Sequence, residues 1–199
     1  MVSERIFLYF CSMISEKQPT RCYWCNLRNP LYVAYHDHEW GVPVHDDRLL
    51  FEGLVLEGFV AGLSWECILN KREAFRRAFD GFGCTTVAAY DNEKIDALCH
   101  DAAIVRNRQK IAAAVHNAQI FIKIQQEFGS FDRYIWHFSN FQTIVECGIT
   151  SSPLSDAISV DLRRRGMKFV GTTTIYAFLQ AIGIIWAHEK ECFCAKFEN

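Results

Sequence analysis

Apolar residues recur at spacings of three and four through most of the chain, and the two-residue alternation of a half-buried strand is scarce. This period is typical of helices with one face in a core. One helix is predicted from Asn29-Pro30 to about residue 36, because an Asn N-cap followed by proline is a common helix beginning. A longer helix, capped by Asp46 or Asp47, is predicted over residues 48–63.

Most of the remaining expected helices begin at a polar N-cap residue or end at a glycine. They cover residues 71–79, two short segments capped by Thr86 and Asp91, and residues 106–128, 152–165 and 171–188. Residues 138–150 follow no period and are expected to form a loop. The sequence therefore predicts an all-α fold, with one domain over residues 21–199 whose N- and C-terminal segments meet.

The composition indicates a reducing compartment. The chain has 199 residues, nine of them cysteines, and a formal net charge of −2. An odd number of cysteines without a convincing export signal argues against a disulfide framework. The apolar run at residues 6–11 is too short to span a membrane, and later apolar runs are interrupted by charges. We expect a cytoplasmic protein without a membrane partner, in which residues 1–20 form a poorly ordered leader.

Glu57 is the acidic residue whose position needs an explanation. On a helix it shares a stripe with Leu50, Leu54 and Ala61, so its carboxylate lies among apolar neighbours. Spacing alone leaves two interpretations equally open, a salt bridge to an arginine or a functional acid. Glu52, on the same helix, falls off that stripe and is expected to be solvated.

An aromatic cluster is expected near this acid. Tyr32, Tyr35 and His36 have i, i+3, i+4 spacing, so they share one face of the first helix. Trp65 follows the turn after the Glu57 helix. Such rings are suited to stacking on a flat ligand, although a plain core contact has the same spacing.

Cysteine and histidine residues gather near both ends of the chain. They are Cys22, Cys25 and His36 near one end and His188, Cys192 and Cys194 near the other. His188 and Cys192 are four residues apart, so a helix would place them on one face. Four Cys/His ligands from the two segments would close a tetrahedral structural metal site. A set of four cysteines and a set of free buried thiols are the alternatives.

Basic residues form three local clusters in this near-neutral chain. The clusters are Lys71-Arg72 with Arg76-Arg77, Arg106 with Arg108 and Lys110, and Arg163-Arg164-Arg165 with Lys168. Two of them flank predicted helix beginnings, where free backbone N–H groups attract phosphate. This favours a contact with a DNA backbone over a solvated charged face.

Several stretches together resemble the bacterial 3-methyladenine DNA glycosylase I family, a branch of the helix-hairpin-helix glycosylases. They are Pro30-Leu31-Tyr32-x-Ala34-Tyr35-His36-Asp37-x-Glu39-Trp40-Gly41-Val42-Pro43, Leu56-Glu57-Gly58-x-x-Ala61-Gly62-Leu63-Ser64-Trp65, and Arg165-Gly166-x-Lys168-Phe169-Val170-Gly171-Thr172-Thr173. Shorter matches are Arg21-Cys22-x-Trp24, Asp101-Ala102 with Arg106, Arg108 and Lys110, and His188 with Cys192. The likeness runs in order from about residue 21 to residue 194.

The resemblance implies three groups of functional residues. A structural Zn²⁺, one per chain, would be held by Cys22, His36, His188 and Cys192. The base pocket would contain Glu57 as its catalytic residue, with substrate-binding Tyr32, Tyr35 and Trp65. DNA would be contacted by a wedging turn at Gly62-Leu63, by Arg106, Arg108 and Lys110 of a hairpin, and by Lys168.

The resemblance also implies an activity. A monomer would flip 3-methyladenine out of alkylated double-stranded DNA and hydrolyse its N-glycosidic bond, leaving an abasic site without a lyase step. Aromatic stacking and cation–π attraction would favour the cationic base, and ionised Glu57 would hydrogen-bond its edge. The alternatives are a glycosylase for another alkylated base, a zinc-stabilised DNA-binding protein without turnover, and an enzyme with catalytic zinc. Glu57 and Trp65 argue against the second, and four protein ligands argue against the third.

Two positions depart from the family pattern. Val60 stands beside the wedging turn where a glutamine is usual, which bears on substrate range or on DNA grip. Ala103 replaces a hairpin glycine, and a positive φ at this alanine would be strained.

Overall fold

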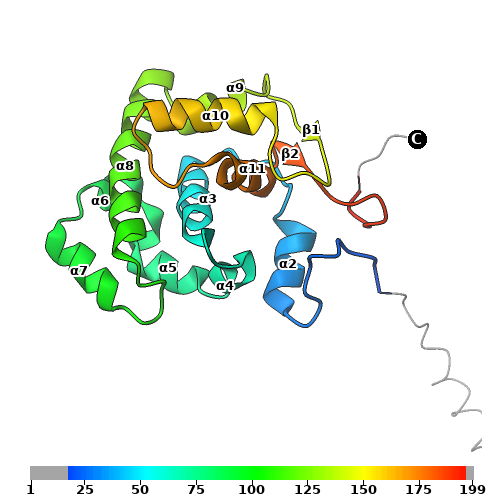
Figure 1. Cartoon of the computed structure of the whole chain (residues 1–199), viewed down its shortest axis with the longest axis horizontal. Coiled ribbons are helices and arrows are strands. Elements are labelled where there is room, and N and C mark those ends of the chain that lie inside the picture. Colours follow the sequence, from blue (N-terminus) through cyan, green and yellow to red (C-terminus); the bar gives the residue numbers. More distant parts are fainter. Residues whose placement is uncertain (1–17, 196–199) are drawn as a thin grey trace, which may run out of the picture.

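The computed structural model describes residues 18–195, which form a mostly helical body (Figure 1). The leader predicted over residues 1–20 lies outside the described residues except for its last three. One of these, Thr20, is joined to the body, because its carbonyl accepts a hydrogen bond from the Phe193 N–H at 2.9 Å. Within residues 18–195, no helix combines the length and apolar character that crossing a membrane requires.

The all-α expectation is confirmed apart from one pair of very short strands. The helical elements are α2 (Pro30–His38), α3 (Asp47–Val60), α4 (Trp65–Leu69), α5 (Arg72–Ala78), the 3-10 turn η1 (Asp80–Phe82), α6 (Cys84–Ala88), α7 (Asn92–His100), α8 (Arg108–Phe128), α9 (Phe131–His137), α10 (Pro153–Arg164) and α11 (Thr172–Ala181). Strand β1 (Ile144–Val145) lies in the predicted loop and pairs in parallel with β2 (Ile185–Trp186).

Side-chain caps explain where most of these helices begin. The side chains of Asn29, Asp46 and Asp91 accept hydrogen bonds from the first backbone N–H groups of α2, α3 and α7, as predicted. The cap predicted at Thr86 is wrong, since this residue lies inside α6. Helices α4 and α9 were not expected, although each begins after a serine whose side chain caps it.

Helix α3 is the centre of the fold. It contacts α11, α8, α4 and α9, and Figure 1 shows it between α8 on one side and α2 on the other. The side chains of Leu50, Phe51 and Phe59 are fully or almost fully buried in these contacts. The long helix α8 packs against α6, α7 and α9 on the outer side of the core. Because neighbours enclose α3 along most of its length, two charged residues on it, Glu52 and Glu57, are buried.

The last helix is shorter than predicted. Helix α11 ends at Ala181, and the chain turns at Gly183, whose φ is +76°. A Cβ atom on Gly183 would lie 2.5 Å from the Pro43 backbone nitrogen, so only glycine permits this close approach. Residues 185–186 then pair as a strand instead of continuing the helix.

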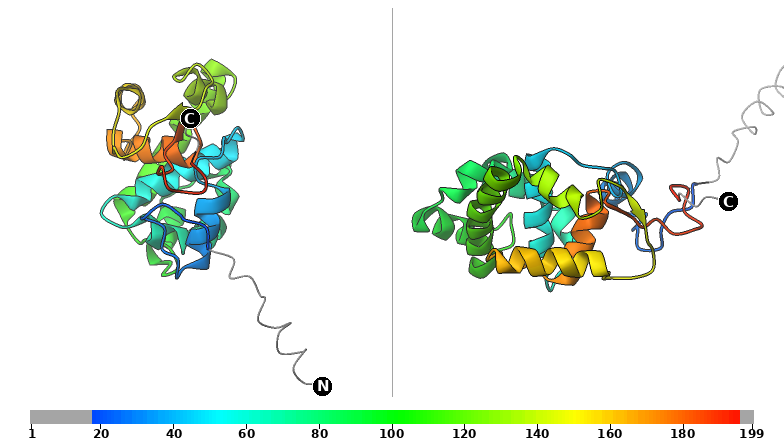
Figure 2. Two further views of the ribbon diagram at one scale, coloured as in Figure 1. Left: turned by 90° about the vertical axis from the view of Figure 1, so that its right-hand side faces the viewer. Right: turned by 90° about the horizontal axis from the view of Figure 1, so that it is seen from above.

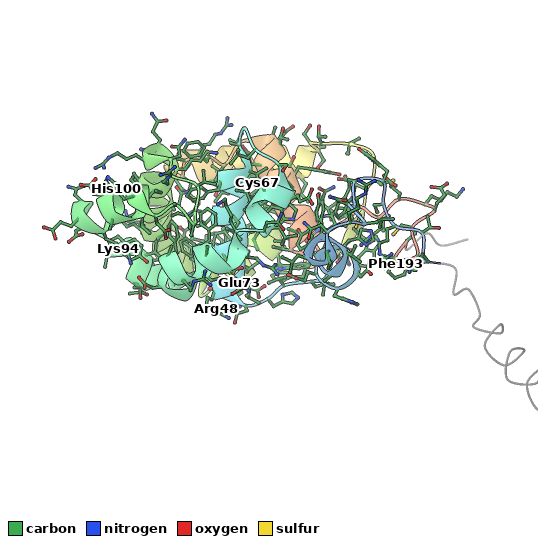
Figure 3. All side chains as sticks on the ribbon, turned by 90° about the horizontal axis from the view of Figure 1, so that it is seen from below. Arg48, Cys67, Glu73, Lys94, His100 and Phe193 are labelled. Carbon is green, nitrogen blue, oxygen red and sulfur yellow. The ribbon has the colours of Figure 1, made fainter. Side chains whose placement is uncertain are left out.

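The two ends of the described chain meet beside α2, as predicted. Figures 1 and 2 show the segments near residues 20 and 190 side by side at one end of the elongated body. Figure 3 places Phe193 at this end and Lys94 and His100 of α7 at the opposite end. The cysteine-rich segments and helix α7 are therefore far apart.

Candidate active site

A cavity of about 620 Å³ opens beside the C-terminal half of α3. Its walls come from α2, α3, α4 and the loops around residues 147–150 and 187–191. Its aromatic and acidic lining residues are Tyr23, Trp24, Tyr32, Tyr35, Trp40, Glu57, Trp65, Glu189 and Glu191. We call this space the base cavity. It brings together all four residues predicted to form the base pocket.

Aromatic rings dominate one wall of the base cavity. The centroids of Tyr35 and Trp65 are 5.2 Å apart, and those of Trp24 and Tyr32 are 5.3 Å apart. Trp40 supports Trp24 edge-on, at 4.7 Å and 73°. The i, i+3 spacing on α2 explains why both tyrosines reach the cavity. The wall offers flat apolar faces to a planar ligand.

Glu57 is the buried acid of this cavity. Its side chain is 6% exposed, and within the described part of the chain no hydrogen bond or ion pair satisfies its carboxyl group. Burial raises the pKa of Glu57 to about 8. A cationic ligand that entered the cavity would therefore meet an acid without a protein counter-ion.

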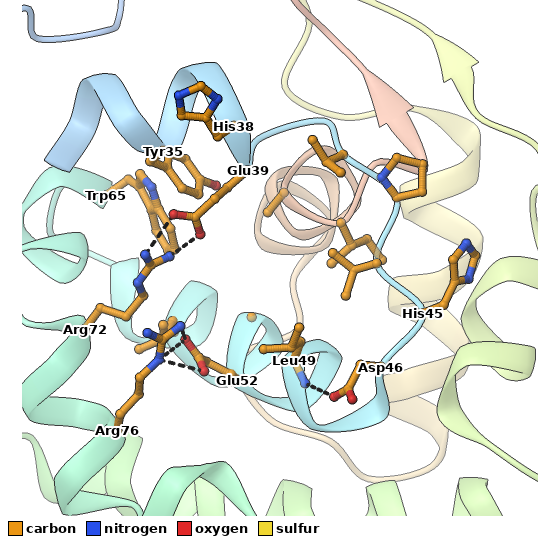
Figure 4. A pocket seen from close by; sticks show the side chains of 17 residues that line it. Tyr35, His38, Glu39, His45, Asp46, Leu49, Glu52, Trp65, Arg72 and Arg76 are labelled. Atoms are coloured by element: carbon orange, nitrogen blue, oxygen red, sulfur yellow. Dashed lines mark hydrogen bonds and ion pairs between the residues drawn. The ribbon is translucent and has the colours of Figure 1, made fainter. Parts of the chain in front are cut away.

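Tyr35 and Trp65 also line a second cavity, which Figure 4 shows from close by. Its volume is about 380 Å³. We call it the ion-pair cavity, because two arginine–glutamate pairs line it. Arg72 binds Glu39 through two hydrogen bonds, of 2.5 and 2.9 Å, and Arg76 Nε binds Glu52 at 2.9 and 3.0 Å.

The prediction that Glu52 is solvated is wrong. Its side chain is 4% exposed, because α4 and α5 cover that side of α3 and bring Arg76 against it. The solvated part of α3 is confined to its first turn, where Arg48 and Leu49 are exposed. The pairing with Arg76 makes the burial of Glu52 tolerable.

Four metal-ligand side chains converge where the two ends of the chain meet. Cys22, His36, His188 and Cys192 are all buried, and one ligand atom of each lies within 4.8 Å of the others. Cys192 Sγ is 3.5 Å from His36 Nε2 and from His188 Nδ1. We call these four residues the Cys/His cluster. Ligand atoms about 2.0–2.3 Å from a central Zn²⁺ would be about 3.5 Å apart in a tetrahedron, so the cluster fits that ion.

Neighbouring groups orient the two histidines of the cluster. Asp37 Oδ1 lies 2.8 Å from His36 Nδ1, and Arg21 holds the same carboxylate. His188 Nε2 lies 3.2 Å from the Trp40 carbonyl oxygen, which leaves Nδ1 facing the cysteines. Such outer contacts fix the ring nitrogen that faces a metal.

The prediction that His188 and Cys192 share a helix face is wrong, although both residues lie in the cluster. Residues 187–195 form turns after β2 and not a helix, so the i, i+4 spacing does not act through a helix face. Of the alternative set of four cysteines, Cys25 and Cys194 lie outside the cluster. Cys25 Sγ lies 3.9 Å from the Tyr32 carbonyl oxygen.

Most of the residues predicted to contact DNA are exposed. Gly62, with φ +78° and nothing within 4 Å of its Cβ position, forms an open turn with Leu63, which is 43% exposed. Helices α7 and α8 are joined by residues 101–107, which form a hairpin-like connection. Arg106 is exposed at the start of α8, and exposed Arg108 pairs with Asp96 of α7.

A sequence profile described as Methyladenine glycosylase matches residues 24–195, most of the chain. The chain belongs to the methyladenine glycosylase family. The DNA-3-methyladenine glycosylase 1 of Escherichia coli (strain K12) is 44% identical over 180 residues, covering 87% of this chain and 96% of that protein. The family resemblance drawn from the motifs is thereby confirmed.

Solved structures of this family share the fold. A crystal structure of 3-methyladenine DNA glycosylase I matches with a TM-score of 0.85 and 42% identity, covering 89% of this chain and 100% of that one. A variant of 3-methyladenine DNA glycosylase I in complex with 3-methyladenine matches with a TM-score of 0.82 and 38% identity, covering 86% of this chain and 96% of that one.

In this methyladenine glycosylase, Lys110 does not point outward as a phosphate ligand should. Its side chain is 7% exposed, and its ammonium donates to the carbonyl oxygens of Phe59 and Ala61. The predicted DNA contact of Lys110 therefore conflicts with its placement. Lys168, by contrast, is exposed. Ala103 does not have the strain that a positive φ would cause, because its φ is not positive.

Sequence reasoning missed two aromatic residues of this methyladenine glycosylase. Trp24 and Trp40 both line the base cavity, yet neither was proposed as a pocket residue. Trp24 lies in a short irregular segment before α2, so no helical spacing relates it to the tyrosines. Its place between Cys22 and Cys25, two candidate metal ligands, is the sequence signal that could have marked this segment as packed against the body.

Proposed function

We propose that this protein is a DNA-3-methyladenine glycosylase, which removes the methylated base from alkylated DNA by hydrolysis of its N-glycosidic bond. The reaction leaves an abasic site and belongs to base excision repair. The observation that carries the proposal is the buried, uncompensated carboxyl group of Glu57 in an aromatic cavity. The 3-methyladenine complex of the related glycosylase I supports the same ligand for the base cavity.

The chemistry of the lesion fits the base cavity. Methylation at N3 gives the nucleoside a positive charge, which weakens its base pairing and makes the base a good leaving group. A flipped base between Tyr32, Tyr35 and Trp65 would gain stacking and cation–π attraction of about 1–2 kcal/mol per favourable face. Neutral adenine gains less from these rings, so the cavity selects for the charged base.

Glu57 supplies a negative charge that complements the positive charge of the methylated base. With its pKa raised to about 8, the carboxyl group is mostly protonated at neutral pH when the cavity is empty. A cationic base in contact with the carboxylate favours its ionised form, and a charge-assisted hydrogen bond then forms. The residue thus acts through recognition of the cation. The departing base needs little help from a general base.

The DNA surface is assembled from three exposed parts. We assign α7, residues 101–107 and α8 to the helix-hairpin-helix element that holds one strand of double-stranded DNA, with Arg106 and Arg108 near phosphates. Lys168 would add a further phosphate contact. The Gly62-Leu63 turn would enter the helix where the base has left it, because an apolar side chain can replace a stacked base. The enzyme would act as a monomer in the cytoplasm.

The Cys/His cluster is proposed to hold one structural Zn²⁺ per chain. Two sulfur and two nitrogen ligands are the preferred donors of this ion, and protein atoms fill all four positions. The ion would pin Cys22 to the segment after β2. It takes no part in the reaction, because its ligands leave no position for water or substrate.

The activity is tested by incubating the purified protein with methylated DNA and identifying the released bases by chromatography. We expect free 3-methyladenine and an intact strand. Release of another alkylated base in preference would change the assigned lesion. Absence of any released base would contradict the assignment as an enzyme and leave a DNA-binding protein.

The metal is tested by elemental analysis of the purified protein. We expect about one zinc per chain, lost together with most of the folded protein in His188→Ala. Cys25→Ser is the matched control, since Cys25 is a buried cysteine beside the cluster but outside it. A well-folded protein without any metal would refute the proposal.

A further inference from the structure

Lys110 links the start of α8 to the end of α3, two parts of the molecule to which the proposed function gives separate roles. Lys110 is the third residue of α8, and its backbone N–H is capped by the Asn107 side chain. Its ammonium nitrogen lies 2.9 Å from the Phe59 carbonyl oxygen and 2.5 Å from the Ala61 carbonyl oxygen. Both carbonyls belong to the end of α3. Glu57 lies on the same helix, three residues before its last residue, Val60.

These carbonyls need a donor from elsewhere. The last four carbonyl groups of a helix have no partner within it, and their partial negative charge favours a cation. The last turn of α3 contains no basic residue. The Val60 carbonyl is satisfied by the Leu63 N–H at 2.6 Å, whereas those of Phe59 and Ala61 accept from Lys110. A residue 49 to 51 positions away thus completes this helix end.

A buried lysine is costly, so its retention requires a benefit. Burial lowers the pKa of Lys110, and within residues 18–195 no acidic side chain forms an ion pair with it. Apart from the hydrogen bond from the Leu63 N–H to the Val60 carbonyl, the turn beyond Ala61 has few contacts of its own. Nothing packs against Gly62 within 4 Å of its Cβ position, and Leu63 is 43% exposed. Lys110 is therefore a principal restraint on the direction in which the turn leaves α3.

We propose that Lys110 is a positioning residue, which locks the Gly62-Leu63 turn and the end of the Glu57 helix to the start of α8. The turn that enters DNA and the hairpin that grips its backbone would then move as one unit. This inference rests on the proposed function of both parts. It replaces the phosphate contact predicted for Lys110, since an ammonium committed to two carbonyls is directed into the protein.

The test compares Lys110→Met with Arg106→Met, which removes one exposed cation from the same end of α8. For Lys110→Met we expect single-turnover release of 3-methyladenine to fall by about tenfold to a hundredfold, because a misplaced group loses its oriented approach. The salt dependence of binding to undamaged DNA should stay as in the wild type. For Arg106→Met the slope of log affinity against log salt should fall by about 0.9.

Two further measurements separate positioning from a general loss of structure. The affinity for free 3-methyladenine, followed by tryptophan fluorescence, should be unchanged in Lys110→Met, since the base cavity is intact. Lys110→Gln, whose amide can donate to one carbonyl, should lose less activity than Lys110→Met and serves where the latter fails to fold. A reduced salt slope in either variant, or a wild-type release rate, would overturn the proposal.

A double-mutant cycle with Leu63→Ala asks whether Lys110 acts through the turn. If it does, Lys110→Met should cost far less in the Leu63→Ala background than in the wild type. Additive losses would overturn action through the turn. A wild-type release rate for Leu63→Ala alone would instead overturn the proposed wedge, so the two failures give different results.

Discussion

Two glutamates on α3 are buried to nearly the same degree but line different cavities. Glu52 is 4% exposed and faces the ion-pair cavity, whereas Glu57 is 6% exposed and faces the base cavity. Glu52 is matched by Arg76 at hydrogen-bond distance. Glu57 has no such partner within residues 18–195, and its pKa is raised to about 8. The same residue type, five positions apart, therefore meets two different electrostatic environments.

The difference shows which carboxylate is neutralised by a protein residue and which remains available to a ligand. A buried carboxylate that is paired with an arginine contributes to structure and has no charge to offer an incoming cation. A buried carboxyl group without a partner costs stability, and such a cost is typical of functional sites. The absence of a counter-ion beside Glu57 thus distinguishes the base cavity. Burial alone would not distinguish Glu57 from Glu52.

The largest expected effect is that of Glu57→Gln on base release. The amide keeps the shape but cannot provide a negative charge to the cationic base. We expect the single-turnover rate of 3-methyladenine release to fall about 100-fold, equal to about 2.7 kcal/mol, with the fold retained. Glu52→Gln is the matched control on the same helix and should release the base at a near wild-type rate per folded molecule. Equal activity of both variants would assign Glu57 to structure.

The second effect is a dependence of base release on pH. Only ionised Glu57 attracts the cation, so release at subsaturating DNA should rise by up to about tenfold per pH unit below a pH of about 8 and level off above it. Glu57→Gln should have a flat profile. A wild-type profile that is flat between pH 6 and 8 would contradict a raised pKa for Glu57.

The raised pKa of Glu57 also makes the stability of the fold decrease as the pH rises. The folded-state pKa of Glu57 lies above its ordinary value of 4.5, so the unfolded chain loses this proton at lower pH than the folded one. Stability from this group is fully present below pH 4.5 and is lost as the pH rises to about 8. Glu57→Gln removes that loss. Its Tm at pH 8 should therefore exceed that of the wild type by several degrees, measured by calorimetry.

Local spacing placed three residues of the base cavity on inward helix faces, but the family resemblance was needed to assign them to a base pocket. Tyr32 and Tyr35 reach it because they share a face of α2, and Glu57 reaches it from the inner stripe of α3. The Cys/His cluster was less determined, since only His36 lies on a helix and its other members lie in irregular segments at the two ends of the chain. Spacing left Cys25 and Cys194 as alternatives, and the family resemblance separated them.

Contacts between distant segments were the part that sequence patterns missed. The pairing of Glu52 with Arg76 spans 24 residues, and the contact of Lys110 with the Phe59 carbonyl spans 51. Both depend on which helices surround α3, and neither periodicity nor capping gives that arrangement. Glu52 was therefore assigned to solvent and Lys110 to DNA, although the fold turns both side chains inward.

The smallest expected effect is on the ion-pair side of the comparison. Arg76→Met would leave Glu52 buried without a counter-ion, and the free energy of unfolding should fall by about 1–2 kcal/mol, less than for a fully buried pair because Arg76 is 33% exposed. Glu52→Gln should cost less, since the arginine it abandons still binds Glu73. Urea denaturation measures both values. If Arg76→Met kept its stability but lost base release, the ion-pair cavity would belong to the functional site, and the contrast between the two glutamates would fail.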